Sequence, residues 1–346
     1  MPLNILAIGD AHFKTSNIKE VDDFLNKLES FLEEHKGNID ICVNLGDTLH
    51  EHSRLHIAPL NKAIKYTELL SRYAPTYVII GNHCSINNSI FLSTDHWANC
   101  LKGWKNVTVV DKVIVDVIKG VKLGFCPYVP DGRFIEALNT VKDEWKDCSV
   151  IFSHITITGA DMGTAIATSG TKWNSEFPLL VCGHIHKSQW IGENMYYTGS
   201  AMQVDINESP DKHICIVNIN DNINIEEHDI GIIRKKIIEL SIENIDEFNL
   251  QQGGINNNIQ YTLYITGTYE QIRAFRKSDK YKRLNRNVRI SFRPSNTQIQ
   301  YKQVEKSFDQ LITEGIVGNR LLESFYLALT EGTEDISDNL DKYLII

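Results

Sequence analysis

The sequence predicts an α/β fold in which helices cover mixed sheets. Strand and helix signals alternate along the first two thirds of the 346-residue chain, and hairpin-like strands follow them. Alternating strands and helices are typical of a layered domain in which helices pack on the faces of a sheet. Hydrophobic residues make up 42% of the chain and charged residues 23%, which excludes wholesale disorder, collagen-like repeats and a small disulfide scaffold.

Short apolar, often β-branched runs predict the strands, and apolar residues that recur at helical spacing predict the helices. The first predicted elements are a strand over residues 4–8, a helix over 21–32, a strand over 39–45, a helix over 59–73 and a strand over 76–80. Next come strands over 107–110, 113–118 and 121–125, a helix over 133–145, and strands over 149–153 and 179–182. The last three strands of this part, expected to be antiparallel, are 195–198, 213–218 and 223–228.

A change in composition between about residues 230 and 260 predicts a domain boundary, because residues 251–258 form a polar break rich in Gly and Asn. Beyond the break, strands over 260–266 and 288–292 flank a helix near 270–277, and helical periodicity runs over about 304–330. The predicted domains are residues 1–230, 231–300 and 301–346, the last being a helical segment.

Several bulk features concern the compartment and the partners. The seven cysteines form no Cys-x-x-Cys pair, so we expect buried free thiols in a reducing compartment. No apolar run approaches the ~18 residues of a membrane span, and the N-terminus does not read as a signal peptide. These features predict a cytoplasmic protein without membrane contact. The net charge of −9 argues against nucleic-acid binding over the whole surface but not against a local basic site.

Polar residues follow five predicted strands. The motifs are Gly9-Asp10-Ala11-His12, Gly46-Asp47-Thr48-Leu49-His50, Gly81-Asn82-His83-Cys84, Ser153-His154 and Gly183-His184-Ile185-His186. Ligands bind at the carboxyl edge of strands in open α/β sheets, so we expect these side chains at one edge of a sheet. Each motif alone is weak, because a lone His or Gly-Asp is usually an ordinary surface or turn feature. The five together predict a metal site.

The donor types indicate which ions such a site would take. Carboxylates, imidazoles and an amide carbonyl, without a thiolate motif, suit manganese, iron or zinc. Two ions roughly 3.5–4 Å apart can hold both the attacking and the leaving oxygen of a phosphoryl displacement. Asp47, which follows a strand between two others, is the natural bridge between them.

The order of these motifs resembles the calcineurin-like metallophosphoesterase superfamily over about residues 3–204. The resemblance implies a four-layer α/β sandwich of two mixed sheets flanked by helices, with a small α+β capping domain and C-terminal helices. It also implies two divalent metal ions, with Mn²⁺ expected. The implied ligands are Asp10, His12 and His186 at the first ion, Asn82, His154 and His184 at the second, and Asp47 bridging both.

The second motif points to one branch of the superfamily. Its Gly-Asp-x-apolar-His pattern, ending in His50, resembles nucleases rather than protein phosphatases, as does the segment Tyr197-Thr-Gly-Ser-Ala201. The resemblance implies an SbcD-type DNA repair nuclease, similar to the recombination endonuclease subunit of tailed phages. A hydroxide bridging the metals would attack phosphorus, and His83 would protonate the leaving oxygen, with His50 as a second catalytic residue.

The same resemblance implies the activities and the partners. The expected activities are exonuclease on duplex ends and endonuclease on single strands or hairpins. The expected partners are DNA, an SbcC-type ABC ATPase subunit and a second copy of the chain. Two amphipathic stretches within residues 304–329 would either pack inside the second domain or dock on the ATPase, and periodicity does not separate these interpretations.

A basic cluster in the distal third supports nucleic-acid binding independently. Nine basic residues and one acid, Asp279, lie between residues 273 and 293, a local charge of about +8, with Phe275, Tyr281 and Phe292 interleaved. This pattern predicts a salt-dependent contact with a phosphate backbone, the alternative being a solvated basic face. The basic residues are Arg273, Arg276, Lys277, Lys280, Lys282, Arg283, Arg286, Arg289 and Arg293.

Cys84 departs from the superfamily pattern, in which Asp or Glu follows the third-motif His. That carboxylate is thought to orient the imidazole, so we expect His83 to be a weaker acid here, with metal binding retained and nuclease activity altered. Two alternatives stay open. One is an enzyme of the same fold acting on a small-molecule phosphoester, and the other is a catalytically weakened scaffold.

Overall fold

The computed structural model describes residues 2–295, without residues 53, 164, 246–247, 249–257 and 287. Contacts divide the chain into two units, residues 1–267 with 271–293, and residues 268–270 with 294–346. The predicted helical segment 301–346, with its periodicity over 304–330, lies outside the described residues. The predicted domain boundaries near residues 230 and 300 stay predictions.

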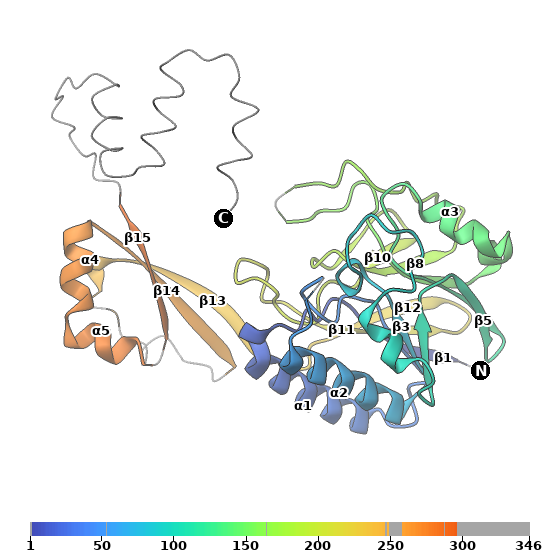
Figure 1. The fold of residues 1–346 in the computed structure, drawn as a ribbon, viewed down its shortest axis with the longest axis horizontal. Coiled ribbons are helices and arrows are strands. Elements are labelled where there is room, and N and C mark those ends of the chain that lie inside the picture. Colours follow the sequence, from blue (N-terminus) through green and yellow to red (C-terminus); the bar gives the residue numbers. More distant parts are fainter. Residues whose placement is uncertain are drawn as a thin grey trace, which may run out of the picture. The chain divides into compact units, whose positions relative to one another are not determined.

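The first sheet has six strands in the order β12-β11-β1-β2-β3-β4 (Figure 1). The middle strands are parallel, and a hairpin of β11 and β12 adds antiparallel to β1. The strands are β1 (Leu3–Ile8), β2 (Ile41–Asn44), β3 (Thr76–Ile79), β4 (Val107–Val110), β11 (Ile214–Ile219) and β12 (Ile223–His228). Helices α1 (Ile18–Glu34) and α2 (Ile57–Tyr73) cover it, because Val21, Phe24 and Leu28 recur at helical spacing and are buried against the sheet.

The second sheet also has six strands, in the order β5-β6-β7-β8-β10-β9. Its strands are β5 (Ile114–Ile118), β6 (Val121–Cys126), β7 (Val150–His154), β8 (Leu179–Gly183), β9 (Gln189–Trp190) and β10 (Met195–Tyr197). The prediction that the strand near residue 195 is antiparallel is wrong with respect to β8. The short β9 reverses the chain before β10, so that β10 runs parallel to β8 and antiparallel to β9.

The helix predicted over 133–145 is shorter than expected. It comprises α3 (Phe134–Leu138), a 3-10 turn over Asn139–Val141 and another over Glu144–Asp147. Lys142 has a φ of 55°, which interrupts helical geometry between the two turns. Trp145 is nevertheless buried against the second sheet, so the apolar period was a correct sign of packing.

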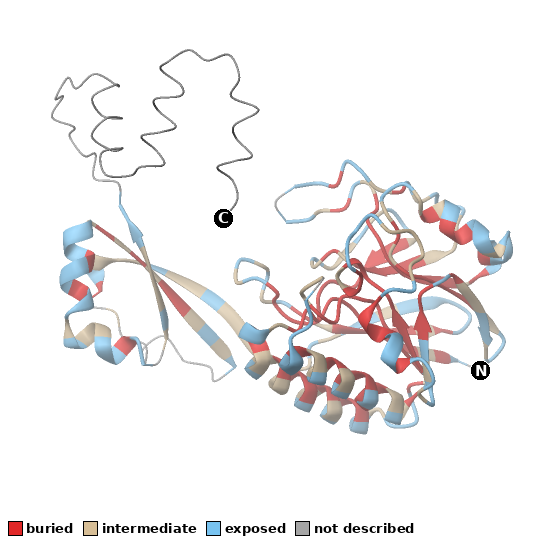
Figure 2. Ribbon diagram, in the orientation of Figure 1, coloured by how far each residue is buried: buried red, intermediate tan, exposed pale blue. Residues whose placement is uncertain are grey.

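The two sheets face each other across a core that follows from strand alternation. In β1, Leu6 and Ile8 face α1 and α2, whereas Ile5 and Ala7 face the second sheet. Phe125 and Phe152 meet them from β6 and β7. Figure 2 shows the buried residues concentrated in these strands and on the inner sides of α1 and α2. The result is the expected four-layer sandwich of helix, sheet, sheet and helix.

A third sheet of three strands, ordered β13-β14-β15, carries two helices. Its elements are β13 (Arg234–Ser241), β14 (Ile259–Gly267), α4 (Tyr269–Arg276), α5 (Asp279–Leu284) and β15 (Arg289–Pro294). β13 and α5 were missed by the sequence prediction. Among the helices of the described residues, none has the length and apolar character that crossing a membrane requires.

The aromatic residues interleaved with the basic cluster form part of the core of this small module. Phe275, Tyr281 and Phe292 pack on one another with ring centroids 5.7–6.3 Å apart, beside the buried Leu263 and Ile265. These side chains lie on the faces of α4, α5 and β15 that point into the core of the module. Their interleaving therefore reflects amphipathic packing rather than a row of exposed rings for stacking on bases.

Candidate metal centre

The five polar motifs meet at the carboxyl ends of strands from both sheets. β1, β2 and β3 belong to the first sheet, and β7 and β8 to the second. The prediction that they share one edge of one sheet is therefore wrong. Because the two sheets pack face to face, the ends of their parallel strands form one site across the sandwich.

Close packing explains the glycines that open several motifs. A Cβ at Gly46 would lie 2.6 Å from Nδ1 of His154, and one at Gly81 would lie 2.7 Å from the backbone nitrogen of Asp47. One at Gly183 would lie 2.9 Å from a carboxylate oxygen of Asp10. The motifs from the two sheets approach so closely that a side chain at these positions would displace a polar group of the site.

Backbone strain is also concentrated here. Among the described residues, eight other than glycine have a positive φ, and four of these belong to the motifs. They are Asp10 (44°), His12 (45°), Asp47 (44°) and His184 (82°). Such conformations cost of order 1–3 kcal/mol each and gather at functional sites. The surrounding fold holds these side chains in place against a local preference.

The first group of candidate ligands comprises Asp10, His12, His186 and Asp47. Nε2 of His12 lies 3.0 Å from Nε2 of His186, and 3.8 Å from both Oδ1 of Asp10 and Oδ2 of Asp47. Asp10, His12 and Asp47 are buried, and His186 is half-buried. The backbone N–H of His184 donates to both carboxylate oxygens of Asp10, at 3.0 and 2.9 Å, and thereby fixes its orientation.

The second group comprises Asn82, His154, His184 and again Asp47. Oδ1 of Asn82 lies 2.9 Å from both Nε2 of His154 and Nδ1 of His184, and these two nitrogens are 3.2 Å apart. Oδ2 of Asp47 lies 3.1 Å from Nε2 of His154. Asp47 therefore lies within reach of both groups, where the sequence prediction places the bridging ligand.

These separations and donor types fit two divalent ions. Ligand atoms that share an ion at about 2.1 Å lie roughly 3.0–3.4 Å apart in octahedral or tetrahedral geometry. The nitrogen pairs His12–His186 and His154–His184 are spaced in this way. Imidazoles, carboxylates and an amide oxygen suit manganese, iron or zinc. All seven predicted ligands come together, and their roles toward an ion stay predictions.

Burial and mutual charge set the ionisation of the groups. Burial raises the pKa of Asp10 to about 6 and lowers the pKa of His184 to about 3. Burial also lowers the pKa of His154, but the charge of Asp47 outweighs it and raises that pKa to about 9. Burial lowers the pKa of His12 well below its usual value. His12 and His184 are thus neutral near pH 7, the form in which an imidazole binds metal.

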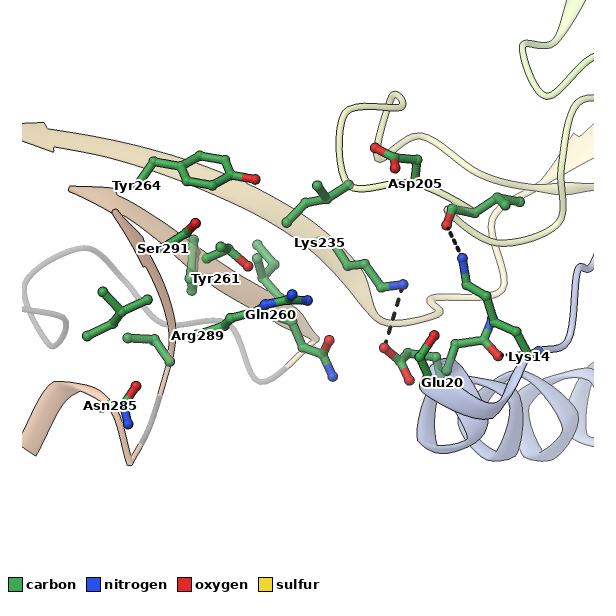
Figure 3. A pocket seen from close by; sticks show the side chains of 18 of the residues that line it. Lys14, Glu20, Asp205, Lys235, Gln260, Tyr261, Tyr264, Asn285, Arg289 and Ser291 are labelled. Carbon is green, nitrogen blue, oxygen red and sulfur yellow. Dashed lines mark hydrogen bonds and ion pairs between the residues drawn. The ribbon is translucent and has the colours of Figure 1, made fainter. Parts of the chain in front are cut away.

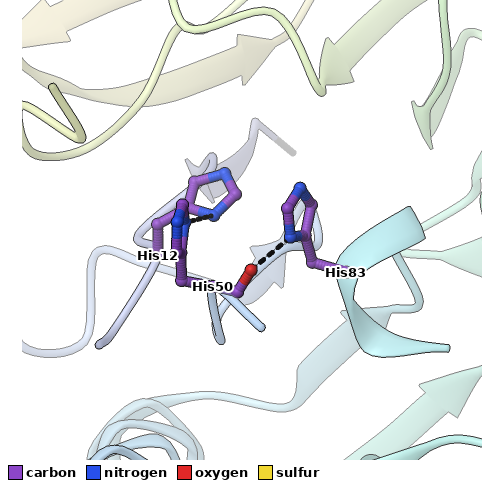
Figure 4. Close-up of side chains that lie close together, drawn as sticks. All are labelled: His12, His50 and His83. Atoms are coloured by element: carbon purple, nitrogen blue, oxygen red, sulfur yellow. Dashed lines mark hydrogen bonds between the residues drawn. The ribbon is translucent and has the colours of Figure 1, made fainter. Parts of the chain in front are cut away.

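Figure 4 shows a third group, formed by His12, His50 and His83. Nδ1 of His50 lies 3.3 Å from Nδ1 of His12, and Nδ1 of His83 donates to the carbonyl oxygen of His50. A carbonyl only accepts, so the proton of neutral His83 is on Nδ1. Nε2 of His83 then faces the centre, 4.0 Å from Oδ2 of Asp47.

The partner of His83 bears on the expectation about Cys84. Cys84 is buried in the apolar core between the first sheet and its helices, together with Leu49 and Trp97. His83 instead donates from Nδ1 to the carbonyl oxygen of His50 and from its backbone N–H to the Asp47 carboxylate. Neither of these hydrogen bonds involves residue 84, and the expected weaker acidity of His83 stays a prediction.

Sequence reasoning missed three residues of the site. Oε1 of Glu208 lies 2.8 Å from Nδ1 of His186, and Nζ of the buried Lys212 lies 2.9 Å from Oε2 of Glu208. The ring of His52 stacks on His83 at a centroid distance of 4.1 Å. Glu208 and Lys212 belong to the segment between β10 and β11, where no strand or helix period marks them. His52 lies two residues after His50, the end of the second motif, so its position in the sequence was a signal that could have identified it.

Burial raises the pKa of Glu208, but its hydrogen bond with His186 and the charge of Lys212 outweigh burial and lower that pKa to about 2. The carboxylate is therefore ionised at neutral pH. The same hydrogen bond offsets the effect of burial on His186 and raises its pKa above the usual value.

A cavity of about 960 Å³ is shown in Figure 3. Lys14, Lys235, Arg286 and Arg289 are among its lining residues, with Glu20 and Asp205 as the acids. Nζ of Lys14 donates to the carbonyl of Val204 at 2.9 Å, and Nζ of Lys235 lies 3.6 Å from Oε1 of Glu20.

The structure locates the predicted DNA-binding residues without testing their role. Arg273 and Arg276 lie on α4, and Lys280, Lys282 and Arg283 on α5. Arg286 and Arg289 line the cavity of Figure 3. Lys277 follows α4 and is exposed.

Comparison with known proteins places the chain in a family. The model of the family described as Calcineurin-like phosphoesterase matches residues 3–188, which is more than half of the chain. The chain belongs to this family. Its fold is accordingly that of the metallophosphoesterases, a family of metal-dependent phosphoester hydrolases.

Two viral relatives, both named "Putative phosphoesterase", align with most of this metallophosphoesterase. 244L of Invertebrate iridescent virus 6 is 39% identical over 79% of the chain and 97% of its own length. 078R of Invertebrate iridescent virus 3 is 36% identical over 82% of the chain and 81% of its own length. Among solved structures, Chaetomium thermophilum Vps29 aligns with 65% of the chain and 96% of its own, at 12% identity and a TM-score of 0.32.

Proposed function

We propose that this metallophosphoesterase is an SbcD-type DNA phosphodiesterase. The observation that carries the proposal is the cavity lined by Lys14, Lys235, Arg286 and Arg289. Lys14 is two residues from the candidate ligand His12. A polyanion attracts such groups through its phosphates, and neutralising them releases counterions. Four cations spread along one cavity suit a polyanion, which can contact several of them through successive phosphates.

Two divalent ions at the centre, which we propose to be Mn²⁺, would polarise the phosphoryl oxygens and lower the pKa of bound water. Asp10, His12 and His186 would hold one and Asn82, His154 and His184 the other, with Asp47 between them. The remaining chemistry belongs to His83. In its doubly protonated form, His83 keeps its Nδ1–H on the carbonyl oxygen of His50 and presents its Nε2–H to the centre, where it supplies the proton that the leaving oxygen takes.

His50 supports this centre in a second way. If His12 binds an ion through Nε2, its Nδ1 carries the proton and donates to Nδ1 of His50. The proton of neutral His50 is then on Nε2, where it is available to a phosphate oxygen. His50 would thus orient His12 through its side chain and His83 through its backbone carbonyl.

The proposal is tested by cleavage of end-labelled duplex and single-stranded DNA with Mn²⁺, beside a chromogenic phosphodiester. Wild type is compared with Asp47→Ala and His83→Ala. Cleavage of DNA that both substitutions abolish supports the proposal. Turnover of the small ester without any cleavage of DNA, also after addition of an SbcC-type ATPase, contradicts it.

A second candidate function, hydrolysis of a small-molecule phosphoester, is favoured by another cavity. This cavity of about 710 Å³ is bordered directly by His184 and His186, and its lining carries the acids Glu208, Asp211 and Glu227 beside Lys187 and Lys212. Its size suits a small ligand, which would lie directly beside the two histidines. The third possibility, a non-catalytic scaffold, has less support because all seven candidate ligands are present and close together.

We also propose an SbcC-type ABC ATPase and a second copy of the chain as partners, on the strength of the resemblance. We place the activity in the cytoplasm, that of the host for a viral chain. The seven free cysteines, of which all but Cys100 are buried, or nearly so, in the structure, are consistent with a reducing compartment. Light scattering of the full chain, alone and with the ATPase, would measure both assemblies. A chain that stays monomeric and does not bind the ATPase contradicts both proposed assemblies.

A further inference from the structure

We propose that Glu208 is a positioning residue that, together with Lys212, holds His186 so that its Nε2 faces the first metal ion. The inference rests on the metal centre of the proposed function. It adds two residues that lie outside the five motifs and names their task.

The carboxylate of Glu208 uses both of its oxygens. Oε1 lies 2.8 Å from Nδ1 of His186, whereas Oε2 accepts from the backbone N–H of Val204 at 3.0 Å and from Nζ of Lys212 at 2.9 Å. An ionised carboxylate only accepts, so the proton of His186 lies on Nδ1. Its Nε2 is then the free lone pair, and this is the atom 3.0 Å from Nε2 of His12.

Lys212 holds the same histidine from its backbone side. It is only 5% exposed, and its Nζ donates to the carbonyl oxygen of His186 at 3.0 Å and to Oγ of Ser200 at 2.7 Å. With Glu208 as the third acceptor, the buried ammonium has a partner for each of its protons. A buried lysine is costly unless it is paired in this way. The pair therefore fixes both the backbone and the ring of His186.

The candidate ligands His154 and His12 are held differently. Nδ1 of His154 donates to the carbonyl oxygen of Leu45 at 2.8 Å, and Nδ1 of His12 meets Nδ1 of His50. In the described residues, His186 is the candidate ligand whose remote nitrogen meets a carboxylate. A carboxylate raises the basicity of an imidazole ligand, and loss of such a partner typically lowers metal affinity about 10–100-fold. The effect should fall on the first ion alone.

The first test is calorimetric titration of the full chain with Mn²⁺. Glu208→Gln keeps the shape of the side chain and removes its charge, and Lys212→Met removes the ammonium. We expect either change to lower the affinity for one of the two ions about 10–100-fold and to leave the affinity for the other unchanged. The matched control is Asp111→Asn, which alters a similar trio of Asp111, His96 and Lys102 outside the centre and should leave both affinities unchanged.

The second test needs no variant that could misfold. Nitrogen NMR of the histidine rings, in the full chain stripped of metal by a chelator and at a pH high enough to make His186 neutral, reports which nitrogen of His186 carries its single proton. We expect the proton on Nδ1. A neutral His186 with its proton on Nε2 overturns the proposal, as does unchanged Mn²⁺ affinity in a Glu208→Gln protein that melts like wild type. If wild type binds no ion, the metal centre of the proposed function fails, and the NMR result still decides the orientation of His186.

Discussion

Nε2 of His12 lies 3.0 Å from Nε2 of His186, although 174 residues separate them in sequence. One follows β1 of the first sheet and the other follows β8 of the second. Two imidazole nitrogens that face each other, one on a buried and one on a half-buried ring, gain little unless a proton or a cation lies between them. The packing of the two sheets thus assembles an acceptor pair that suits a shared ion.

The first prediction concerns ion stoichiometry. Wild type should hold two divalent ions per chain, His186→Ala and His184→Ala one each, and Asp47→Ala the least, because Asp47 lies within reach of both groups. Mass spectrometry of metals in the purified proteins measures this. His228→Ala, a histidine outside the groups, is the control. Two ions retained in Asp47→Ala would contradict a bridging role.

The second prediction concerns His83 as the general acid. His83→Ala should lower kcat on DNA by roughly 10²–10⁴-fold, because its proton is needed by a poor leaving oxygen. With a nitrophenyl phosphodiester, whose leaving group needs no proton, the loss should be far smaller. The ratio of the two losses is the measurement, and metal content should stay at two. Equal losses on both substrates would show that His83 acts by binding phosphate rather than by donating a proton.

The third prediction concerns Cys84. Because Nδ1 of His83 bonds to the carbonyl of His50, Cys84→Ala should leave the pH profile of turnover unchanged. The smaller side chain should cost about 1 kcal/mol of stability from lost packing. A shift of the profile in Cys84→Ala would restore the hypothesis that residue 84 tunes His83. Denaturant melts beside the kinetics separate the two effects.

Strand periodicity and the residue after a strand are local signals, so the alternating strands and helices and the five strand-end motifs were predictable, whereas the four-layer sandwich was implied by the resemblance to the superfamily. What it could not show is that β7 and β8 belong to a different sheet from β1, since pairing is a non-local property. Glu208 was missed for a similar reason. Its partner His186 is 22 residues away, and Glu208 itself lies in the irregular segment between β10 and β11, where no period sets the direction of a side chain.

β13 was missed because charged residues surround its short apolar centre, Ile237–Ile238, and because it pairs with β14 across a long connection. The role of the aromatic residues interleaved with the basic cluster could not be predicted from sequence, because a buried face and a stacking face have the same sequence period. Only packing distinguishes Phe275 in a core from Phe275 on a nucleic-acid surface.

The fourth prediction concerns the thiols. Cys100 is exposed, whereas burial raises the pKa of Cys42, Cys84 and Cys215 to about 12 and of Cys148 to about 11. At pH 8 a disulfide reagent should therefore titrate one thiol rapidly in the native chain and seven after unfolding. Cys100→Ser should remove the fast thiol. Several fast thiols in native wild type would contradict the burial of the remaining six.

The last prediction separates space from backbone conformation at a glycine. Gly81 has a φ of −88°, which any residue adopts, so its conformation does not require glycine. An added Cβ would lie 2.7 Å from the backbone nitrogen of Asp47 and closer still to its Oδ1. Gly81→Ala should therefore displace the bridging candidate and abolish binding of both ions.

Gly103 provides the matched control, because its φ is 101° and an added Cβ would meet nothing within 4 Å. Gly103→Ala should cost about 1 kcal/mol through backbone strain and leave both ions bound. Calorimetric titration with Mn²⁺ and thermal melts of both variants measure the difference. If Gly81→Ala binds two ions with the affinity of wild type, metal binding does not need Asp47 in its present position. That result would contradict the assignment of Asp47 as the bridging ligand.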